Sequence, residues 1–468
     1  MTILLVFLSL FGLGGQTMFD TYFTGQTFRF DYYHSGSTKE EHISMDEIRL
    51  EGSWAGSKVN LIDESNLGKY FFEVVDLKSN KVIYSRGFAS IYGEWETTGE
   101  AVKSWRSFHE SQRFPEPKDR VQLVLKKRQD DGSFSQIYTA TIDPASRFIN
   151  RSPLVPAGEV WTVFESGDPT TKVDLLILAD GYTAKDKDKF HKDVARLVGV
   201  MFNTEPYKSH KKDFNVRAID IFSAQSGISN PRKGIWRKSA LGLSFNSFDS
   251  DRYVLTNENK NMREMAANAP YDAIIMVAND RKYGGGGIFN LWATVTSDTE
   301  PSAYVFVHEF GHSFAGLGDE YYTSPVSYEN YTLPAVEPWE PNVTALFDPS
   351  NVKWKHLVEA GTPLPTPWNK EEYDKYEVDR QKKRAQMIAE QATEEQMESL
   401  FKEVKQITTP MLQKNKFFGK VGAFEGAGYE SKGLYRPELD CIMFTRNEVP
   451  FCRVCTEAIL KAIKMYAE

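Results

Sequence analysis

The residues with the most specific chemistry form the motif His308-Glu309-Phe310-Gly311-His312. Histidines four positions apart lie on one face of a helix, so their two imidazoles can bind one Zn²⁺. Glu309 then lies beside the metal, where it can accept a proton from water instead of binding the ion. The chain has only 8 His, so this spacing rarely arises by chance. The motif predicts metal-assisted hydrolysis rather than a core helix with incidental histidines.

A catalytic zinc site also needs a third protein ligand and an open position for water. Gly316 can end the helix in a left-handed conformation, which turns the chain back toward the metal. Asp319 is the first carboxylate that the returning chain reaches, and we predict it as the third ligand. Glu320 is the immediate alternative.

The residues after the helix are similar to the metzincin motif H-E-x-x-H-x-x-G-x-x-H, with departures. The glycine stands eight positions after His308 instead of seven, and the predicted ligand Asp319 stands eleven positions after it instead of ten. Metzincins also place a methionine turn beneath the zinc, and Met443 is a candidate for it; the alternative is an ordinary core methionine. Thr445 stands where some metzincins have a tyrosine that stabilises the oxyanion, so that role is vacant or filled from elsewhere.

The helix must be held by a framework, and around the motif the chain alternates buried strands with helices. Apolar runs predict strands at 173–179, 214–222 and 273–278, and helical spacing predicts a helix over 185–202. This alternation predicts an α/β (α+β) fold for the part that carries the motif. A charged segment at 369–406 has no Gly or Pro and predicts a solvated helical hairpin inserted on the surface.

The first part of the chain has a different pattern. Short alternating runs, for example 27–32, 70–75 and 121–125, are separated by turn residues, which predicts an all-β sandwich-like domain. No nucleophile, metal cluster or phosphate loop is evident there. We therefore predict an N-terminal β-sandwich-like domain over 16–152 and a catalytic domain over 153–468.

Composition and the N-terminal residues limit location and partners. The 468 residues include 56 Lys+Arg and 64 Asp+Glu, a formal net charge of −8, so no nucleic acid partner is expected. The apolar run Ile3–Gly14 is too short to span a bilayer, which needs about 20 residues. It predicts a signal peptide over 1–15 and export to the periplasm, cell surface or medium; the alternative is a buried strand. No later run is long enough to predict a transmembrane segment.

Four stretches together resemble the IgA peptidase family M64: HEFGHSFAGLGDEYY at 308–322, LLILADGYT at 175–183, YGGGGIFNLWAT at 283–294 and GLYRPELDCIMF at 433–444. That family comprises secreted zinc peptidases, often with a β-rich module before the catalytic part. The resemblance covers nearly all of residues 156–468 except the charged insert, and more loosely the first module. It implies a metzincin-like catalytic domain.

The resemblance also implies a function for this site. It implies a zinc endopeptidase with one catalytic Zn²⁺ per chain, held by His308, His312 and Asp319, with Glu309 as general base and Met443 in the methionine turn. It further implies protein or peptide substrates, with host glycoproteins and immunoglobulins as candidates.

The three cysteines, Cys441, Cys452 and Cys455, lie within fifteen residues. In an exported protein this number predicts one disulfide and one remaining thiol, acting as a clamp near the methionine turn. The C-x-x-C spacing of the last two is weak support for a second metal, because two more ligands would be needed.

Two features leave alternatives open. The run Gly284–Gly287 lets a peptide backbone approach closely and predicts either a rim where substrate pairs as an extra strand or a flexible loop. The site chemistry also suits a zinc amidase or deacylase acting on a non-protein substrate. A glycan-binding or host-protein-binding protein is the third hypothesis, and an intact Glu309 argues against it because a binder needs no base.

Overall fold

The N-terminal module is built from two antiparallel sheets. The computed structural model describes residues 18–323, 335–447 and 449–467, so the predicted signal peptide over 1–15 lies outside the described residues. One sheet has the order β2-β1-β5 and the other the order β4-β3-β6-β7. The strands are β1 (Phe23–Gly36), β2 (Glu41–Ser53), β3 (Tyr70–Asp76), β4 (Lys81–Phe88), β5 (Arg106–Pro117), β6 (Val121–Arg128) and β7 (Phe134–Ile142).

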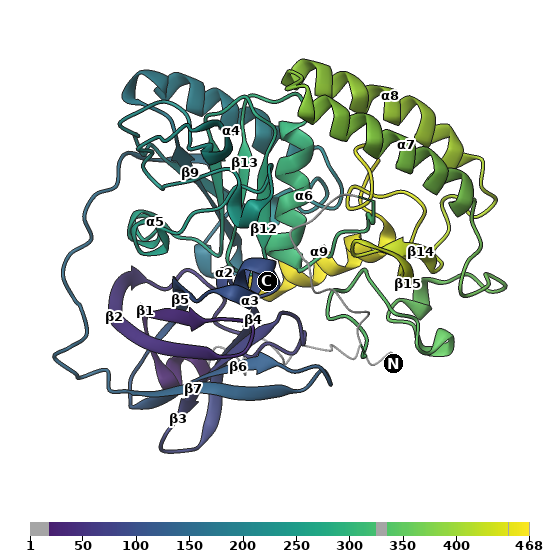
Figure 1. Ribbon diagram of the computed structural model, residues 1–468. Coiled ribbons are helices and arrows are strands. Elements are labelled where there is room, and N and C mark those ends of the chain that lie inside the picture. The colour runs from purple at the N-terminus through teal and green to yellow at the C-terminus, as the bar shows by residue number, and fades with distance from the viewer. Residues whose placement is uncertain (1–17, 324–334, 448, 468) are drawn as a thin grey trace, which may run out of the picture.

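The two sheets share one apolar core because each strand alternates its side chains between a buried and an outer face. Strand β3 shows this alternation along its whole length. The rings of Phe72 on β3 and Phe114 on β5 meet across the sheets, with centroids 6.3 Å apart. Phe28 on β1 packs edge-on against the same Phe114. The module therefore has two sheets packed face to face, shown in purple to blue in Figure 1.

A mixed sheet forms the framework of the second part. Its order is β12-β13-β11-β9-β10-β8, with the inner strands parallel and both edge strands antiparallel to their neighbours. Every residue of β9 is buried, as expected where layers cover both faces of a parallel strand. The strands are β8 (Val160–Phe164), β9 (Val173–Asp180), β10 (Phe214–Ile219), β11 (Ala273–Ala278), β12 (Gly285–Ile288) and β13 (Trp292–Thr296).

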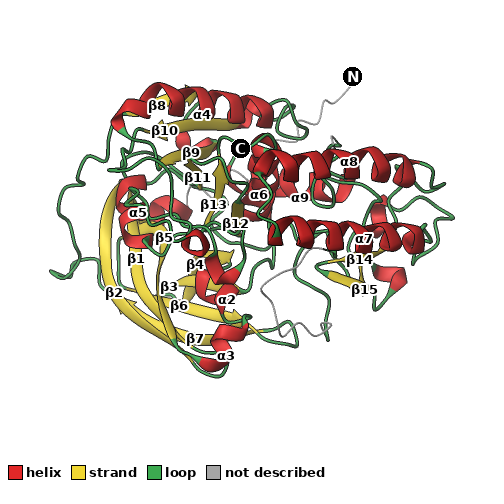
Figure 2. Ribbon diagram, turned by 45° about the horizontal axis from the view of Figure 1, so that its top comes forward, coloured by secondary structure: helices red, strands yellow, loops and turns green. Residues whose placement is uncertain are grey.

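Helix α6 (Ser302–Ala315), which carries the HExxH motif, packs on β12 and β13. Helices α4 (Lys187–Met201) and α9 (Arg453–Tyr466) contact α6, and α5 (Asn259–Ala266) contacts β5 of the N-terminal module. Figure 2 shows α6 and α9 close together beside the mixed sheet. The buried helix is thus held from several directions.

The charged segment forms a helical hairpin of α7 (Lys370–Ala389) and α8 (Glu394–Gln413), and a small ribbon of β14 (Phe424–Ala427) and β15 (Glu430–Arg436) follows it. The second helix runs beyond the expected end at residue 406. Tyr373 and Glu377 on α7 and Leu400 on α8 are buried. The hairpin is therefore not merely a solvated surface element: its inner face packs against the body of the protein.

The two parts of the chain have separate apolar cores, but residues of the first module also pack into the core of the second part. The short helices α2 (Ile91–Trp95) and α3 (Gly99–Lys103) lie between strands of the first module. Tyr92 and Trp95 nevertheless belong to the apolar core of the second part. The backbone N–H of Ala89 also donates to the carbonyl of Phe289 at 2.9 Å. Among the described residues, no helix is both long and apolar enough to cross a membrane.

Candidate metal centre

Helix α6 ends at Gly316, and the chain then turns back toward the motif histidines. Gly316 caps the helix in the left-handed region with φ of 64°. Its N–H donates to the carbonyl of His312 at 3.0 Å, and the N–H of Leu317 donates to the carbonyl of Gly311 at 3.3 Å. This αL cap reverses the chain, so the segment after Gly316 passes back along the helix.

Three polar atoms converge at the turn. The Nε2 atoms of His308 and His312 lie 3.1 Å apart, and Oδ1 of Asp319 lies 3.1 Å and 3.2 Å from them. The Nδ1 of His308 faces the carbonyl of Ile442 at 3.1 Å, and that of His312 faces the carbonyl of Leu317 at 2.5 Å. Since a carbonyl only accepts, both Nδ1 atoms donate, so each Nε2 atom is the ring nitrogen that can bind a metal ion at the centre.

The convergence of two imidazole nitrogens and a carboxylate oxygen fits a cation. Oδ1 of Asp319 is buried without a hydrogen-bond donor of suitable geometry. The three side chains also form one of the described groups whose ligand atoms lie within 4.8 Å of one another. Imidazole and carboxylate are normal ligands of Zn²⁺, with three protein ligands in its catalytic sites. The predicted ligands His308, His312 and Asp319 are therefore brought together.

The electrostatics of the group favour positive charge at the same point. Burial disfavours a charged imidazole, but the Asp319 carboxylate outweighs it and raises the pKa of His312 to about 9. Burial also disfavours ionised Asp319, yet His312 and His308 hold the pKa of its carboxyl well below its usual range. Burial raises the pKa of Glu309, against the opposing effect of the two histidines. A positive charge between the three atoms, from a proton or from a metal ion, stabilises the Asp319 carboxylate.

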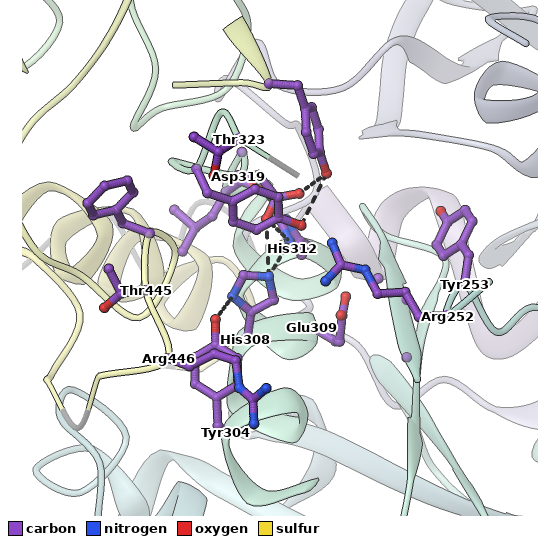
Figure 3. Close-up of a pocket in the computed structure, with 18 of the residues that line it drawn as sticks. Arg252, Tyr253, Tyr304, His308, Glu309, His312, Asp319, Thr323, Thr445 and Arg446 are labelled. Atoms are coloured by element: carbon purple, nitrogen blue, oxygen red, sulfur yellow. Dashed lines mark hydrogen bonds and ion pairs between the residues drawn. The ribbon is translucent and has the colours of Figure 1, made fainter. Parts of the chain in front are cut away.

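The three side chains and Glu309 face a cavity of about 300 Å³. Figure 3 shows Glu309 beside His308, with the guanidinium of Arg252 reaching toward the same space. A cavity of this size accommodates a small part of a peptide. Its walls come from the N-terminal module, the second part of the chain and the helical hairpin. They include Ala89, Glu94 and Thr98 of the first, Arg252, Tyr283, Gly285–Gly287, α6, Trp339, Tyr429 and Thr445 of the second, and Glu377, Arg380, Phe401 and Thr408 of the hairpin.

Several polar residues of the cavity were not predicted from the sequence. Tyr429 donates its hydroxyl to Oδ2 of Asp319, and its neighbour Gly428 donates a backbone N–H to the Asp319 carbonyl at 2.8 Å. Tyr304 donates to the carbonyl of Ile442 at 3.0 Å, beside His308. Arg252 lies in a loop without regular pattern. No motif or spacing in the sequence singles out these residues.

Met443 lies under α6, as the methionine-turn hypothesis expects for this region. It is fully buried, and a side chain added at Gly311 would meet its sulfur at 3.3 Å. Its carbonyl accepts the N–H of Glu320 at 2.8 Å. The Met443 segment therefore contacts both the motif helix and the chain that carries Asp319.

The residue at the position of the metzincin tyrosine forms a hydrogen bond elsewhere. Thr445 lines the cavity, but its hydroxyl donates to Asp440 at 2.6 Å. Arg252 and the tyrosines on the cavity wall remain as groups that can meet a substrate carbonyl.

The glycine run is an edge strand, not a flexible loop. Strand β12 pairs with β13 on one side, and on the other its Gly285 exchanges hydrogen bonds with residues 252 and 254 at 3.2 Å and 3.1 Å. A Cβ on Gly287 would lie 2.4 Å from the Glu309 carbonyl oxygen. At Gly287, the lack of a side chain therefore allows β12 to pack closely against α6.

The prediction of a disulfide is wrong. All three cysteines are free and buried, and Sγ of Cys441 and Sγ of Cys455 lie 3.9 Å apart, whereas a disulfide needs about 2.05 Å. The sulfurs gather instead around the carboxylate of Glu320, whose side chain lies among them and not at the histidines.

The fold and the site together define a class of protein: an α/β domain in which an HExxH helix, a returning carboxylate and a cavity come together is the arrangement of a metallopeptidase. The profile of the IgA Peptidase M64 family matches residues 162–463, and that of the Peptidase M64 N-terminus matches residues 18–139. The chain belongs to the IgA Peptidase M64 family and is a metallopeptidase.

The comparisons also bear on the expected architecture. The resemblance to family M64 is confirmed, and so is the order of a β-rich N-terminal domain followed by a mixed α/β peptidase domain. No curated protein matches the chain.

Proposed function

We propose that this metallopeptidase is a zinc endopeptidase that cleaves protein substrates at the cavity described above. His308, His312 and Asp319 would hold the ion, and Glu309 would act as the general base. The observation that carries the proposal is the convergence of the Nε2 atoms of His308 and His312 and one carboxylate oxygen of Asp319 beside Glu309. A bound Zn²⁺ would supply Lewis-acid chemistry, which makes water more acidic and polarises a carbonyl group.

Glu309 is the residue that moves the proton. It lies on α6 next to His308 and faces the cavity, so its carboxylate can accept a proton from the attacking water. The same carboxyl can return that proton to the amine of the departing peptide. Arg252, which reaches toward Glu309 from the opposite wall, provides positive charge where the carbonyl oxygen becomes negative.

The test of this assignment is a Glu309→Gln variant. It keeps the shape of the side chain and removes the base, so we expect full metal content and a loss of hydrolysis of about 10²–10⁴-fold, the usual contribution of a general base. Metal content and turnover are measured on the same samples. Activity equal to that of the wild type would disprove the mechanism.

Glu300→Gln is the matched control. Glu300 lies just before α6, is exposed, and pairs with Lys402 at 2.8 Å. The same chemical change there should leave both metal content and turnover within about twofold, because an exposed ion pair contributes little.

The substrate class follows from the family and the cavity. We propose proteins as substrates, with immunoglobulin A as the first to examine because the family description names it. Incubation with IgA, IgG and a mixed protein library, followed by mass spectrometry of new termini, tests this. Activity on small acylated amides without any new protein termini would favour an amidase instead.

Export remains part of the proposal. It rests on the apolar run Ile3–Gly14, which has the length of a signal-peptide core. N-terminal sequencing of the protein from the cell exterior should find a chain that begins near residue 16. A chain that remains inside the cell with Met1 intact would contradict export.

A further inference from the structure

A second group of potential ligands lies behind the first. The carboxylate of Glu320 and the sulfurs of Cys441, Cys452 and Cys455 have ligand atoms within 4.8 Å of one another. None of the four side chains is more than 4 % exposed. In the sequence, the C-x-x-C pair lacked two of the four ligands of a metal site. The fold brings Glu320 and Cys441 to this pair.

The spacing suits a tetrahedral ion. With Zn–S bonds of about 2.3 Å, two sulfurs on one tetrahedral Zn²⁺ lie about 3.8 Å apart. The Sγ atoms of Cys441 and Cys455 are 3.9 Å apart. Oε1 of Glu320 lies 3.2 Å from Sγ of Cys455 and 3.8 Å from Sγ of Cys452. A sulfur and an oxygen bound to the same ion would be about 3.6 Å apart by the same geometry.

Backbone N–H groups point at two of the three sulfurs. Cys441 accepts backbone N–H groups from Met443 at 3.4 Å and Cys452 at 3.2 Å. Cys452 caps the N-terminus of α9 and accepts the N–H of Cys455 at 3.4 Å. Donors to the ligand atoms are the usual second layer of a metal site, and a helix N-terminus favours negative charge.

Glu320 has no cation of its own. Asn342 donates to its Oε1 at 3.0 Å, whereas Oε2 is buried without a partner. Among the described residues Glu320 forms no ion pair, and the nearby buried Arg436 donates to the Gly426 carbonyl at 2.7 Å. A buried carboxylate without a cation is costly. A metal ion between the four side chains would provide the missing charge.

We propose that Glu320, Cys441, Cys452 and Cys455 form a closed structural site for a zinc-type divalent cation, separate from the catalytic site. Soft thiolates with one carboxylate select Zn²⁺ over Ca²⁺ or Mg²⁺, and four protein ligands leave no open position for water. Binding releases the three thiol protons to solvent, and no oxidation takes place.

The site would hold together the segments that shape the catalytic centre. Glu320 follows Asp319 directly, and its N–H donates to the carbonyl of Met443. Cys441 lies one residue before Ile442, whose carbonyl accepts from His308 at 3.1 Å. A cation at the second site therefore fixes the position of Asp319 and the orientation of His308 from behind. Its ligands are positioning residues, since they do not face the cavity.

Another described group, Asp31, Asp46 and His109, differs because its carboxylates have cationic partners. Asp31 accepts from Arg29 at 2.8 Å, and Asp46 accepts from Lys260 at 2.6 Å. These carboxylates already have their cations and call for no metal.

The test is a metal count on the full-length chain purified with zinc present. We expect two Zn²⁺ per wild-type chain, one in a His308→Ala/His312→Ala variant, and one in a Cys452→Ser/Cys455→Ser variant. The histidine variant is the matched comparison, because each double substitution removes two ligands from one site only. No zinc in the histidine variant, or two in a folded cysteine variant, would overturn the second site.

X-ray absorption at the zinc edge keeps the proposal testable if the cysteine variant fails to fold. The single zinc of the His308→Ala/His312→Ala variant should show sulfur neighbours at about 2.3 Å. Thiol titration of the denatured, unreduced chain should find three free thiols. A shell of only nitrogen and oxygen, or one free thiol beside a disulfide, would refute the proposal. These readouts do not depend on hydrolysis, so they remain decisive even if the proposed peptidase mechanism fails.

Discussion

Two adjacent residues, Asp319 and Glu320, belong to two different clusters. The Asp319 cluster, with His308 and His312, opens onto a cavity beside the carboxylate of Glu309. The Glu320 cluster is buried in the core and combines this carboxylate with three cysteine sulfurs. The side chain of Asp319 contacts the histidines and that of Glu320 contacts the cysteines, so one short segment serves both clusters.

The difference between the clusters lies in access and ligand type. Zinc chemistry needs an open position, and nitrogen and oxygen ligands with one free side provide it. Four enclosing ligands exclude water and serve only to hold the chain. The same ion type at both places would therefore do chemistry at the first and stabilise structure at the second.

The sharpest way to break this comparison is to remove each neighbour in turn. Asp319→Ala deletes a ligand of the open site, and we expect activity and zinc affinity there to fall by more than about 100-fold, above the loss typical of outer-shell partners. Glu320→Ala should lower activity far less, and mainly weaken the sealed site and thermal stability. Competition with a chelator and turnover are measured for both variants.

The reverse result would exchange the roles of the two residues. If Glu320→Ala released the catalytic metal while Asp319→Ala kept it, the third ligand would be assigned wrongly by one position. Asp319→Glu is a further control, since it retains the carboxylate and should restore part of the metal binding.

Arg252 marks the open cluster as a reaction site. Its cation faces the cavity near Glu309, and the sealed cluster has no such group in reach of substrate. Arg252→Ala should reduce kcat by about 10²–10³-fold, as for loss of an oxyanion donor, with little change in KM. Arg252→Lys should recover part of kcat. An increase in KM alone would assign Arg252 to substrate binding.

Contacts between residues close together in the chain could be predicted from the sequence, whereas contacts between distant residues could not. His308 and His312 are one helical turn apart, and Asp319 follows in the next loop, so local spacing predicted their meeting, with Glu320 left as the alternative third ligand. Three strands of the mixed sheet, β9, β10 and β11, were evident from their apolar runs, whereas β8 and β13 were not predicted and β12 was left undecided between a strand and a loop. Sequence periodicity reports on contacts within one helix or strand. The predicted strands and the HExxH residues lie within single elements, and Asp319 lies in the loop that directly follows one.

The sealed cluster could not be predicted in that way. Glu320 and Cys452 are 132 positions apart, and only the packing of α9 beside the motif helix brings them together. The same holds for Ala89 and Glu94, which the N-terminal module contributes to the cavity wall. A module that looked separate by its pattern thus completes the site of the other.

A smaller effect is expected at Tyr429, which supports the open cluster from outside. Its hydroxyl donates to Oδ2 of Asp319, leaving Oδ1 for the histidine side. Tyr429→Phe removes only this donor and should lower metal affinity or activity about 10–100-fold. Chelator competition measures the affinity. Unchanged affinity and activity would show that the backbone bond from Gly428 alone orients Asp319.

The smallest effect concerns the strand that backs the open cluster. A Cβ on Gly287 would lie 2.4 Å from the Glu309 carbonyl and 2.9 Å from Cβ of His312, so β12 or α6 must move. Gly287→Ala should lower the free energy of unfolding by about 1–3 kcal/mol, the usual cost of overpacking. Gly199→Ala is the matched change on α4, where a Cβ meets no atom within 4 Å. It should raise the free energy of unfolding by about 0.5–1 kcal/mol, since alanine is favoured inside a helix. Denaturant unfolding of both variants decides whether the contact is tight, because only a tight contact gives opposite signs.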